Sequence, residues 1–179
     1  EKGRQPPLIV THRIRLGVRI DYPCPATIGA DRLANACAAV TRFKLPVIAL
    51  DFGTALTFDV ISRNGAYIGG VIAPGLPLMT RYLAERTELL PQIEIKGHPG
   101  WLGRSTVSAM QIGAVVGYRG MVEGILSEMM PHFKGRAPTL LATGGYAAQV
   151  VAGLRRPVKL VPNLTLEGLI RMYELNPRP

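Results

Sequence analysis

All four aspartates of the 179-residue chain lie within one third of it, at positions 21, 31, 51 and 59. Every other acidic residue is a glutamate. Asp is short and poor in helix interiors, and it suits turns, helix caps and metal or phosphate chemistry. We therefore expect the chemistry of this protein between positions 21 and 59.

The stretch LDFGTALTFDVISRNGAYIGG, residues 50–70, runs from a buried strand into a turn and then resumes as a strand. Gly53 allows a sharp turn and lets an anion approach main-chain N–H groups. Thr54 adds a hydroxyl donor, and Asp51 can hold a cation. The pattern predicts a phosphate-binding hairpin, although Asp-x-Gly-Thr also forms ordinary turns. The other common nucleotide motifs, Gly-x4-Gly-Lys-Ser/Thr and Gly-x-Gly-x-x-Gly, are absent from the sequence.

A second candidate is IGADRLANA, residues 28–36, which places Gly29, Asp31 and Arg32 at the mouth of a helix. Backbone N–H groups and the helix dipole favour anions there. Taken alone, Asp31 is also explained as a first-turn acid that stabilises the helix.

The elements that must position these residues have an α/β pattern. Asn-Gly at 64–65 is a strong signal for a hairpin turn. The long helix has Ser105 as its predicted N-cap. The predicted elements are a continuous or broken strand at 8–20, a helix at 30–42, strands at 46–51, 55–62 and 66–73, a helix ending near Glu85, a helix from Ser105 to Met130, a strand at 139–143, a Gly144-Gly145 turn and a helix, a strand at 158–161 and a helix from Thr165 to Glu174.

A glycine stripe runs along the long helix, at Gly113, Gly117, Gly120 and Gly124. Each glycine costs roughly 0.5–1 kcal/mol relative to Ala. We expect close approach by another helix, within the chain or across a dimer, to offset that cost. A crowded core helix is the alternative.

The net charge is +9, from 21 basic and 12 acidic residues, which raises nucleic acid or an anionic substrate as partners. Five basic residues fall in the first twenty positions: Lys2, Arg4, Arg13, Arg15 and Arg19. The last three alternate with apolar residues, which favours the solvated face of a half-buried strand. No aromatic interleaving or RNP-like motif supports nucleic acid.

Cys24 and Cys37 are the only cysteines, and His12, His98 and His132 are scattered. This arrangement argues against structural zinc and is consistent with a reducing cytosol. No apolar run reaches the roughly 18 residues of a membrane span, and no export signal opens the sequence. We expect a soluble, cytoplasmic protein.

Six segments stand in a specific order: IGADRLANA, LDFGTALTFDVI, GGVIAPGL, LGRSTVSAMQIG, ATGG and LTLEGL. Together they closely resemble the type III pantothenate kinases, from about Pro7 to Glu174. The resemblance implies a ribonuclease H-like, actin/sugar-kinase-type α/β fold with two related domains. It also implies a homodimer that phosphorylates pantothenate with ATP, Mg²⁺ and a monovalent cation, K⁺ or NH₄⁺, as the first step of coenzyme A biosynthesis.

The resemblance also implies site residues. Asp31 corresponds to the general base, and Asp51 to the ligand of the monovalent cation. The residues implied to bind substrate are Tyr22, Gly29, Ala30, Asp31, Arg32 and Thr106. Those implied to bind ATP are Gly53, Thr54, Thr143, Gly144 and Gly145.

One departure concerns the first domain of the family, whose Asp-x-Gly-Asn-Thr phosphate loop and Mg²⁺-associated acid have no counterpart here. We therefore expect this chain alone to be a poor kinase or an inactive one. The chain is then a fragment of a full enzyme, one of two polypeptides that together form the enzyme, or a degenerate relative. We favour a fragment. Residues 1–45 are interpreted as the remnant of the first domain and 46–179 as the second. The strand before the helix has no obvious sheet partner in the sequence, which supports this interpretation.

Two other functions stay open. The positive charge and early descriptions of relatives as transcriptional accessory factors suggest a non-catalytic protein associated with nucleic acid. A related kinase that acts on another small hydroxyl compound is the second alternative.

Overall fold

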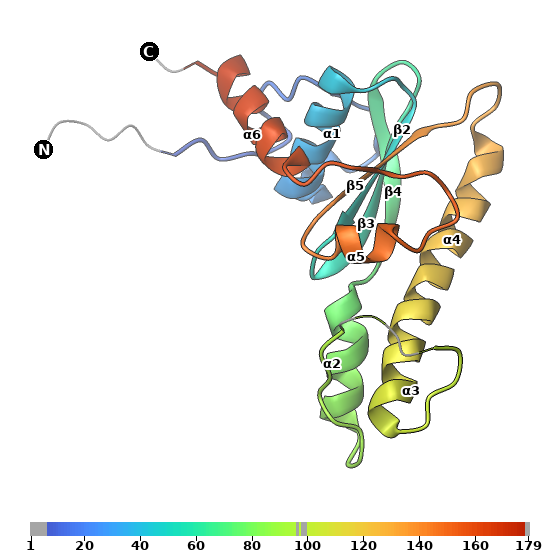
Figure 1. Ribbon diagram of the computed structural model, residues 1–179. Helices are drawn as coiled ribbons and strands as arrows, with labels where there is room; N and C mark the ends of the chain where they lie inside the picture. Colours follow the sequence, from blue (N-terminus) through green and yellow to red (C-terminus); the bar gives the residue numbers. More distant parts are fainter. Residues whose placement is uncertain (1–6, 96, 98–99, 178–179) are drawn as a thin grey trace, which may run out of the picture.

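The predicted α/β architecture is confirmed in the computed structural model, which describes residues 7–95, 97 and 100–177 (Figure 1). One six-stranded sheet has the order β1-β4-β3-β2-β5-β6. Lys2, Arg4 and His98 lie outside the described residues. The strands are β1 (Arg19–Ile20), β2 (Val47–Phe52), β3 (Ala55–Ile61), β4 (Ala66–Pro74), β5 (Thr139–Thr143) and β6 (Lys159–Leu160).

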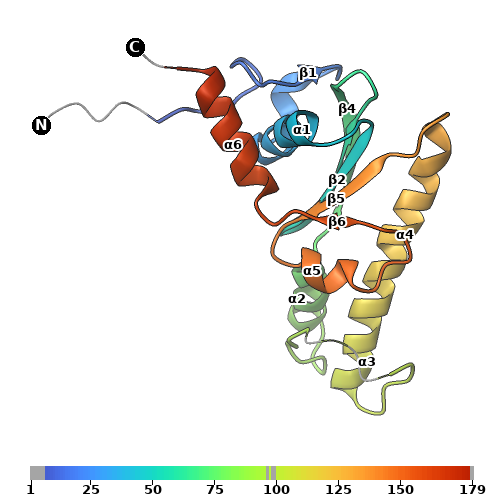
Figure 2. The same cartoon turned by 45° about the horizontal axis from the view of Figure 1, so that its top comes forward.

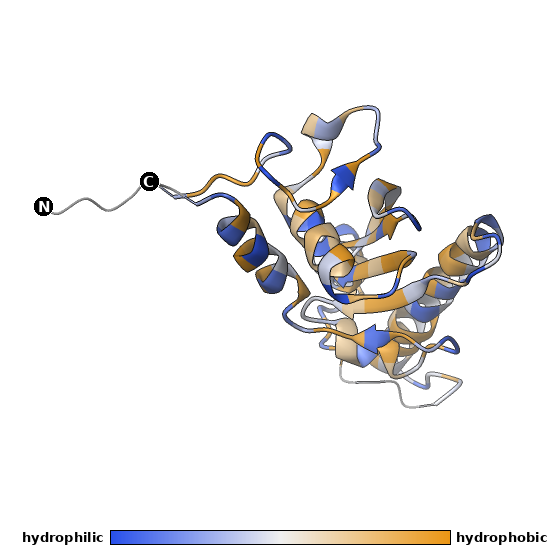
Figure 3. Cartoon of the chain, turned by 90° about the horizontal axis from the view of Figure 1, so that it is seen from above, coloured by the Kyte–Doolittle hydropathy of each residue, from blue (hydrophilic) through white to orange (hydrophobic). Residues whose placement is uncertain are grey.

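Alternation along β2 and β3 divides the interior into two cores. Val47, Ala49 and Ile61 belong to the core on one face of the sheet. Ile48, Leu50 and Phe58 belong to the core on the other face. Successive side chains of a strand point to opposite faces, so strands buried on both sides become continuously apolar. The central strands are accordingly hydrophobic in Figure 3.

Helices cover both faces of the sheet (Figures 1 and 2). The first core is closed by α1 (Ala30–Arg42) and α6 (Leu164–Leu175), which pack against each other. The second core is closed by α4 (Tyr118–Met129) and α5 (Ala147–Val151). This layering brings α1 into contact with both strands, since Asn35 bonds Asp51 of β2 and Arg32 bonds Asp59 of β3.

The predicted long helix begins where expected but is not uniform. Ser105 caps α3 (Thr106–Ile112) by accepting from Ser108 N at 3.2 Å, while Ser105 N donates to Ser108 Oγ at 2.9 Å. A π-helical segment, Gly113–Gly117, then separates α3 from α4. Together with α2 (Leu76–Arg86), α3 forms an arm that projects beyond the sheet (Figure 1).

Two interpretations of the glycine stripe are wrong. At all four glycines, a Cβ atom would have no neighbour within 4 Å among the described residues. All four are exposed, so the stripe is neither part of a crowded core nor an approach point for a helix of the same chain. Packing across a dimer stays a prediction.

The predicted strand over residues 8–20 is also wrong in extent, since only Arg19–Ile20 pairs with a strand, in parallel with β4. The expected alternation holds, because Arg13 and Arg15 are exposed while Leu16 is buried. Gly17, at a φ of 71°, interrupts the extended backbone. Upstream of it, Arg15 N donates to Asn176 Oδ1 at 3.0 Å, so this segment pairs with the end of α6 instead of with a strand.

The strand ahead of α1 therefore finds its partner, β4, within this chain. Described residues on both sides of position 45 share one sheet and one core. The division of the chain into a first-domain remnant and a second domain stays a prediction. None of the helices in the described part of the chain is long and apolar enough to cross a bilayer.

Candidate functional site

The predicted hairpin turn forms between β2 and β3. Gly53 N donates to Ala55 O at 3.1 Å, and Gly75 N donates to Thr54 O at the same distance. A Cβ at Gly75 would lie 2.1 Å from Thr54 O, so only glycine allows this contact. Thr54 is exposed at the tip of the turn, where its hydroxyl is accessible.

A second glycine turn lies beside the first because β5 runs parallel to β2, with Thr143 opposite Asp51. Gly144 has a φ of 94°, and a Cβ there would lie 2.6 Å from the carbonyl carbon of Phe52. Tyr146 N donates to Phe52 O at 3.3 Å. The structure thus brings together the two turns predicted to bind ATP.

The three ATP residues predicted on the second turn differ in what they offer. Thr143 is 1% exposed and its hydroxyl donates to Pro162 O at 3.2 Å, so this side chain already has a structural role. A Cβ at Gly144 would lie 2.7 Å from Asp51 Oδ1, so this glycine lies directly against the Asp51 carboxylate. Gly145 is exposed and has open space around it.

Asp51 is held by two residues that sequence reasoning missed. Asn35 Nδ2 donates to Asp51 Oδ2 at 3.0 Å, and Thr165 Oγ1 donates to Asn35 Oδ1 at 2.7 Å. Asn35 is fully buried. An asparagine among the buried positions of an amphipathic helix must find polar partners, and that signal could have pointed to it.

The environment of Asp51 suits a bound cation. Burial raises the pKa of Asp51, the Asn35 hydrogen bond lowers it, and the charge of Asp31 raises it. A monovalent cation would offset the cost of burying this charge, and carboxylate and carbonyl oxygens are suitable ligands. No group of three or more His, Cys, Asp or Glu residues that could hold a metal occurs in the described part of the chain.

The N-terminal turn of α1 presents Asp31. Gly29 is the N-cap, Ala30 begins the helix, and Arg32 N donates to Asp31 Oδ1 at 2.8 Å. The Asp31 side chain is otherwise exposed to solvent. Because its charge acts on Asp51, the predicted base lies within electrostatic range of the predicted cation site.

Arg32 extends in the other direction, over β3 and β4. Its Nε donates to Asp59 Oδ1 at 2.7 Å, and its guanidinium carbon lies 5.7 Å from the centre of the Tyr67 ring. Burial, the largest single influence, lowers the pKa of Arg32, but the charge and hydrogen bond of Asp59, with smaller effects of Tyr67 and Tyr22, together raise it above its ordinary value. Tyr22 packs edge-on against Tyr67, with ring centres 6.0 Å apart. Tyr22, Arg32 and the start of α1 therefore form one surface, and its role in substrate binding stays a prediction.

Thr106 is not part of this surface. It is the first residue of α3 and is exposed on the projecting arm, away from α1 in both views (Figures 1 and 2). Its assignment to the substrate site stays a prediction.

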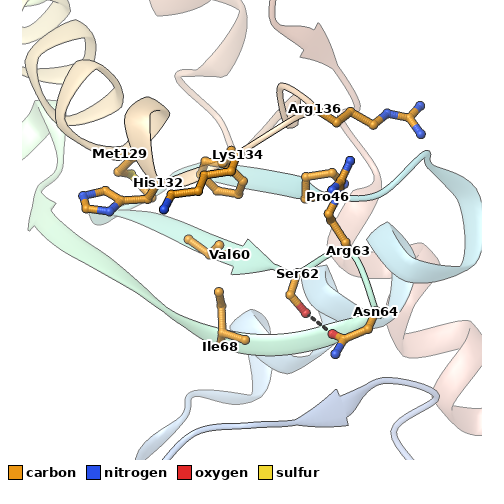
Figure 4. A pocket seen from close by; sticks show the side chains of 11 residues that line it. Pro46, Val60, Ser62, Arg63, Asn64, Ile68, Met129, His132, Lys134 and Arg136 are labelled. Carbon is orange, nitrogen blue, oxygen red and sulfur yellow. Dashed lines mark hydrogen bonds between the residues drawn. The ribbon is translucent and has the colours of Figure 1, made fainter.

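A hollow of about 560 Å³ lies at the other end of β3, between the hairpin at Ser62–Asn64 and the end of α4 (Figure 4). Val60 and Ile68 form part of its apolar floor, and Arg63 and Lys134 are among its basic residues. None of the predicted site residues lines it. Its size is therefore no guide to the chemistry at Asp31 and Asp51.

Comparison with known proteins gives consistent results. A sequence profile described as type III pantothenate kinase matches residues 2–128. A type III pantothenate kinase from Akkermansia muciniphila is 51% identical over 155 residues, which are 87% of this chain and 64% of that protein. One from Roseiflexus sp. is 42% identical over 173 residues, 97% of this chain and 68% of that protein. The chain thus spans slightly less than two thirds of the length of the Akkermansia protein and slightly more than two thirds of the length of the Roseiflexus protein.

Two solved structures share the fold. A Campylobacter jejuni protein, described as belonging to the Baf family of transcriptional activators, superimposes with a TM-score of 0.59 at 21% identity, covering 83% of this chain and 64% of that one. An Alp12 filament structure superimposes with a TM-score of 0.50 at 15% identity, and the match covers 76% of this chain and 51% of that one.

Proposed function

Because the chain belongs to the type III pantothenate kinase family, we propose that the polypeptide that carries it transfers the γ-phosphoryl group of ATP to the primary hydroxyl of pantothenate. The product is 4'-phosphopantothenate, in the first step of coenzyme A biosynthesis. The observation that carries the proposal is the pair of glycine turns beside Asp51, with the exposed Asp31 carboxylate within electrostatic range.

Asp31 acts as the general base in this proposal. The pantothenate oxygen attacks the γ-phosphorus, the bond from that phosphorus to the bridging oxygen of ADP breaks, and the hydroxyl proton passes to Asp31. The transition state of phosphoryl transfer is loose, so the proton can leave late and a carboxylate is a sufficient base. Alignment of the reactants then supplies much of the rate.

The two glycine turns bind ATP, with the phosphates at the turn of Gly53 and Thr54 and the adenosine side at Thr143–Gly145. The Thr54 hydroxyl and the main-chain N–H groups of Gly144 and Gly145 supply donors of the kind that oxyanions need. Gly53, whose own N–H is bound to Ala55 O, shapes the turn that lets the nucleotide approach. Asp51 would hold the monovalent cation, K⁺ or NH₄⁺, on the same side of α1. When bound, this cation and Mg²⁺ neutralise phosphate charge.

The opposite side of α1 binds pantothenate. Gly29, Ala30 and Arg32 offer main-chain and guanidinium donors, and Tyr22 adds an aromatic wall. We further propose a cytoplasmic homodimer in which Thr106, on the projecting arm, contributes to substrate binding. Such a role requires a protomer arrangement that brings α3 to the start of α1.

The test measures ATP-dependent phosphorylation of pantothenate by the full-length polypeptide and by this chain. Each protein is assayed in KCl and in tetramethylammonium chloride, and its intact mass is checked on the same sample. We expect K⁺-dependent turnover by the full-length polypeptide. No phosphopantothenate from that polypeptide in either salt would contradict the proposed function. Turnover by this chain alone would show that the family's phosphate-loop segment is not essential.

A further inference from the structure

Asp59 is a fully buried carboxylate on β3, and the mechanism above gives it no role. Three groups donate to it: Arg32 Nε and the Tyr67 hydroxyl to Oδ1, at 2.7 and 3.2 Å, and Thr57 Oγ1 to Oδ2, at 3.1 Å. Burial of an ion pair costs several kcal/mol per ion, and apolar residues of similar volume often stabilise a fold as well or better. The retained pair therefore points to a use for the Arg32 charge.

The contacts of Arg32 fix its guanidinium on one edge and one face. The Nε edge is bound to Asp59, and the Tyr67 ring lies under the plane. A Cβ at Gly70 would lie 3.0 Å from Nη2, so the neighbouring strand also limits its movement. Among the described residues, Nη1 and Nη2 have no hydrogen-bond acceptor. This outer edge is the fork that binds a carboxylate through two parallel hydrogen bonds.

The sheet order indicates which end of the substrate this fork meets. Asp59 and Tyr67 lie on β3 and β4, whereas Asp51 and Thr143 lie on β2 and β5. Arg32 therefore extends toward β4, away from the two glycine turns. In the proposed function the reacting hydroxyl lies at Asp31, so a fork that extends away from the ATP-binding turns is placed to meet the far, acidic end of the substrate.

We propose that Asp59 is a positioning residue, which holds Arg32 by Nε so that Nη1 and Nη2 bind the carboxylate of the substrate. The inference rests on the proposed function and adds to it a residue of β3 that does not touch the substrate. It predicts that the contribution of Asp59 depends on the charge at the acidic end of the substrate.

The experiment compares pantothenate with its neutral carboxamide as substrates of the full-length polypeptide. Asp59→Asn keeps the shape of the side chain and removes its charge. For pantothenate we expect KM to rise about tenfold with kcat within about twofold, the pattern of lost binding at a group remote from the reaction. For the carboxamide, the same variant should change neither constant by more than about twofold.

Thr57→Val is the second variant, in case Asp59→Asn does not fold; it removes one hydrogen bond from Asp59 and keeps the ion pair. This variant should raise KM for pantothenate by about threefold and should leave KM and kcat for the carboxamide unchanged. Glu128→Gln, on the exposed surface of α4, is the matched control.

Equal losses on the two substrates would mean that Asp59 only supports the fold, and would overturn the proposal. A wild-type polypeptide that phosphorylates neither substrate would instead overturn the proposed function, and the positioning role with it.

Discussion

Asn35 donates to Asp51 across 3.0 Å, although the two residues are 16 positions apart and lie on different elements. Together with the bond between Arg32 and Asp59, this contact ties the first turns of α1 to carboxylates on two neighbouring strands. The start of the helix, and Asp31 with it, is thereby held over the sheet. The polar contacts of the interior thus position the residue that we propose as the base.

Asn35→Ala should destabilise the fold strongly. The substitution leaves Asp51 Oδ2 without its amide donor and the Thr165 hydroxyl without its acceptor. We expect the free energy of unfolding in urea to fall by about 2–3 kcal/mol, since each unsatisfied buried group costs roughly 1–3 kcal/mol. Asn163→Ala is the control, because Asn163 is exposed and its side chain makes no capping hydrogen bond. Equal effects of the two variants would contradict the role given to Asn35.

Asp51→Asn should change how stability depends on pH. The folded pKa of Asp51 is raised above its unfolded value of about 3.9, chiefly by burial. Its contribution to stability is therefore fully present below pH 3.9 and is lost as the pH rises through the folded pKa. Relative to wild type, the Tm of the variant should therefore rise as the pH is raised from 3.5 to 7 without K⁺, and a Tm difference that does not change with pH would contradict this.

The same variant tests the cation site. A ligand that binds only the folded state raises Tm. At pH 7 we expect KCl to raise the Tm of wild type above that in tetramethylammonium chloride, and to have no such effect on Asp51→Asn. A K⁺ effect of the same size in both proteins would place the cation elsewhere.

Gly144→Ala and Gly145→Ala form a matched pair. At Gly144 the backbone is left-handed, and a Cβ would lie 2.6 Å from Phe52 main-chain atoms. We expect a loss of at least about 2 kcal/mol by urea denaturation, because the left-handed conformation alone costs roughly 1–2 kcal/mol. Gly145 has open space, so its alanine variant should remain within about 0.5 kcal/mol of wild type. A well-tolerated Gly144→Ala would argue against the tight packing of the two turns.

Gly120→Ala and Gly124→Ala should each stabilise a monomeric chain by about 0.5–1 kcal/mol, since both are exposed in α4 with open space at Cβ. Gly168→Ala in α6 should have the opposite effect, because its Cβ would clash with the carbonyl oxygen of Ala34 in α1. Thermal denaturation measures both effects, and sedimentation shows the oligomeric state. Destabilisation by the α4 variants together with loss of a dimer would indicate that the stripe packs against a second copy.

Asp31→Asn should lower kcat about 10²–10⁴-fold in the full-length polypeptide, the usual contribution of a general base. The variant should fold normally, because Asp31 is exposed and asparagine can still accept from Arg32 N. Unchanged Tm and circular dichroism would establish this, with Glu128→Gln as the activity control. Near wild-type turnover would remove Asp31 from the role of base.

The sequence predicted α1 and the β3–β4 hairpin well, because local rules govern them: a helical apolar stripe and an Asn-Gly turn. The parallel pairing of β2 with β5, which brings the turns at Gly53 and Gly144 together, was not predicted from the sequence. Sequence reasoning also missed Asn35 and Asp59 as polar anchors, since their partners lie on other elements and no short motif connects them.

The strand predicted over 8–20 failed for a related reason. The alternation that predicted it does exist, but Gly17 and the contact with Asn176 replace strand pairing. The π-helical segment at Gly113–Gly117 has no sequence signal that we can identify.

The contact between Arg15 and Asn176 joins residues 161 positions apart, and α6 completes the core to which α1 belongs. Contacts of such long range form late and slow folding. During synthesis, the apolar face of α1 must wait for α6, which leaves the ribosome long after it. Until then Leu33 and Cys37 are uncovered, and a chain that stops before α6 should aggregate or be degraded.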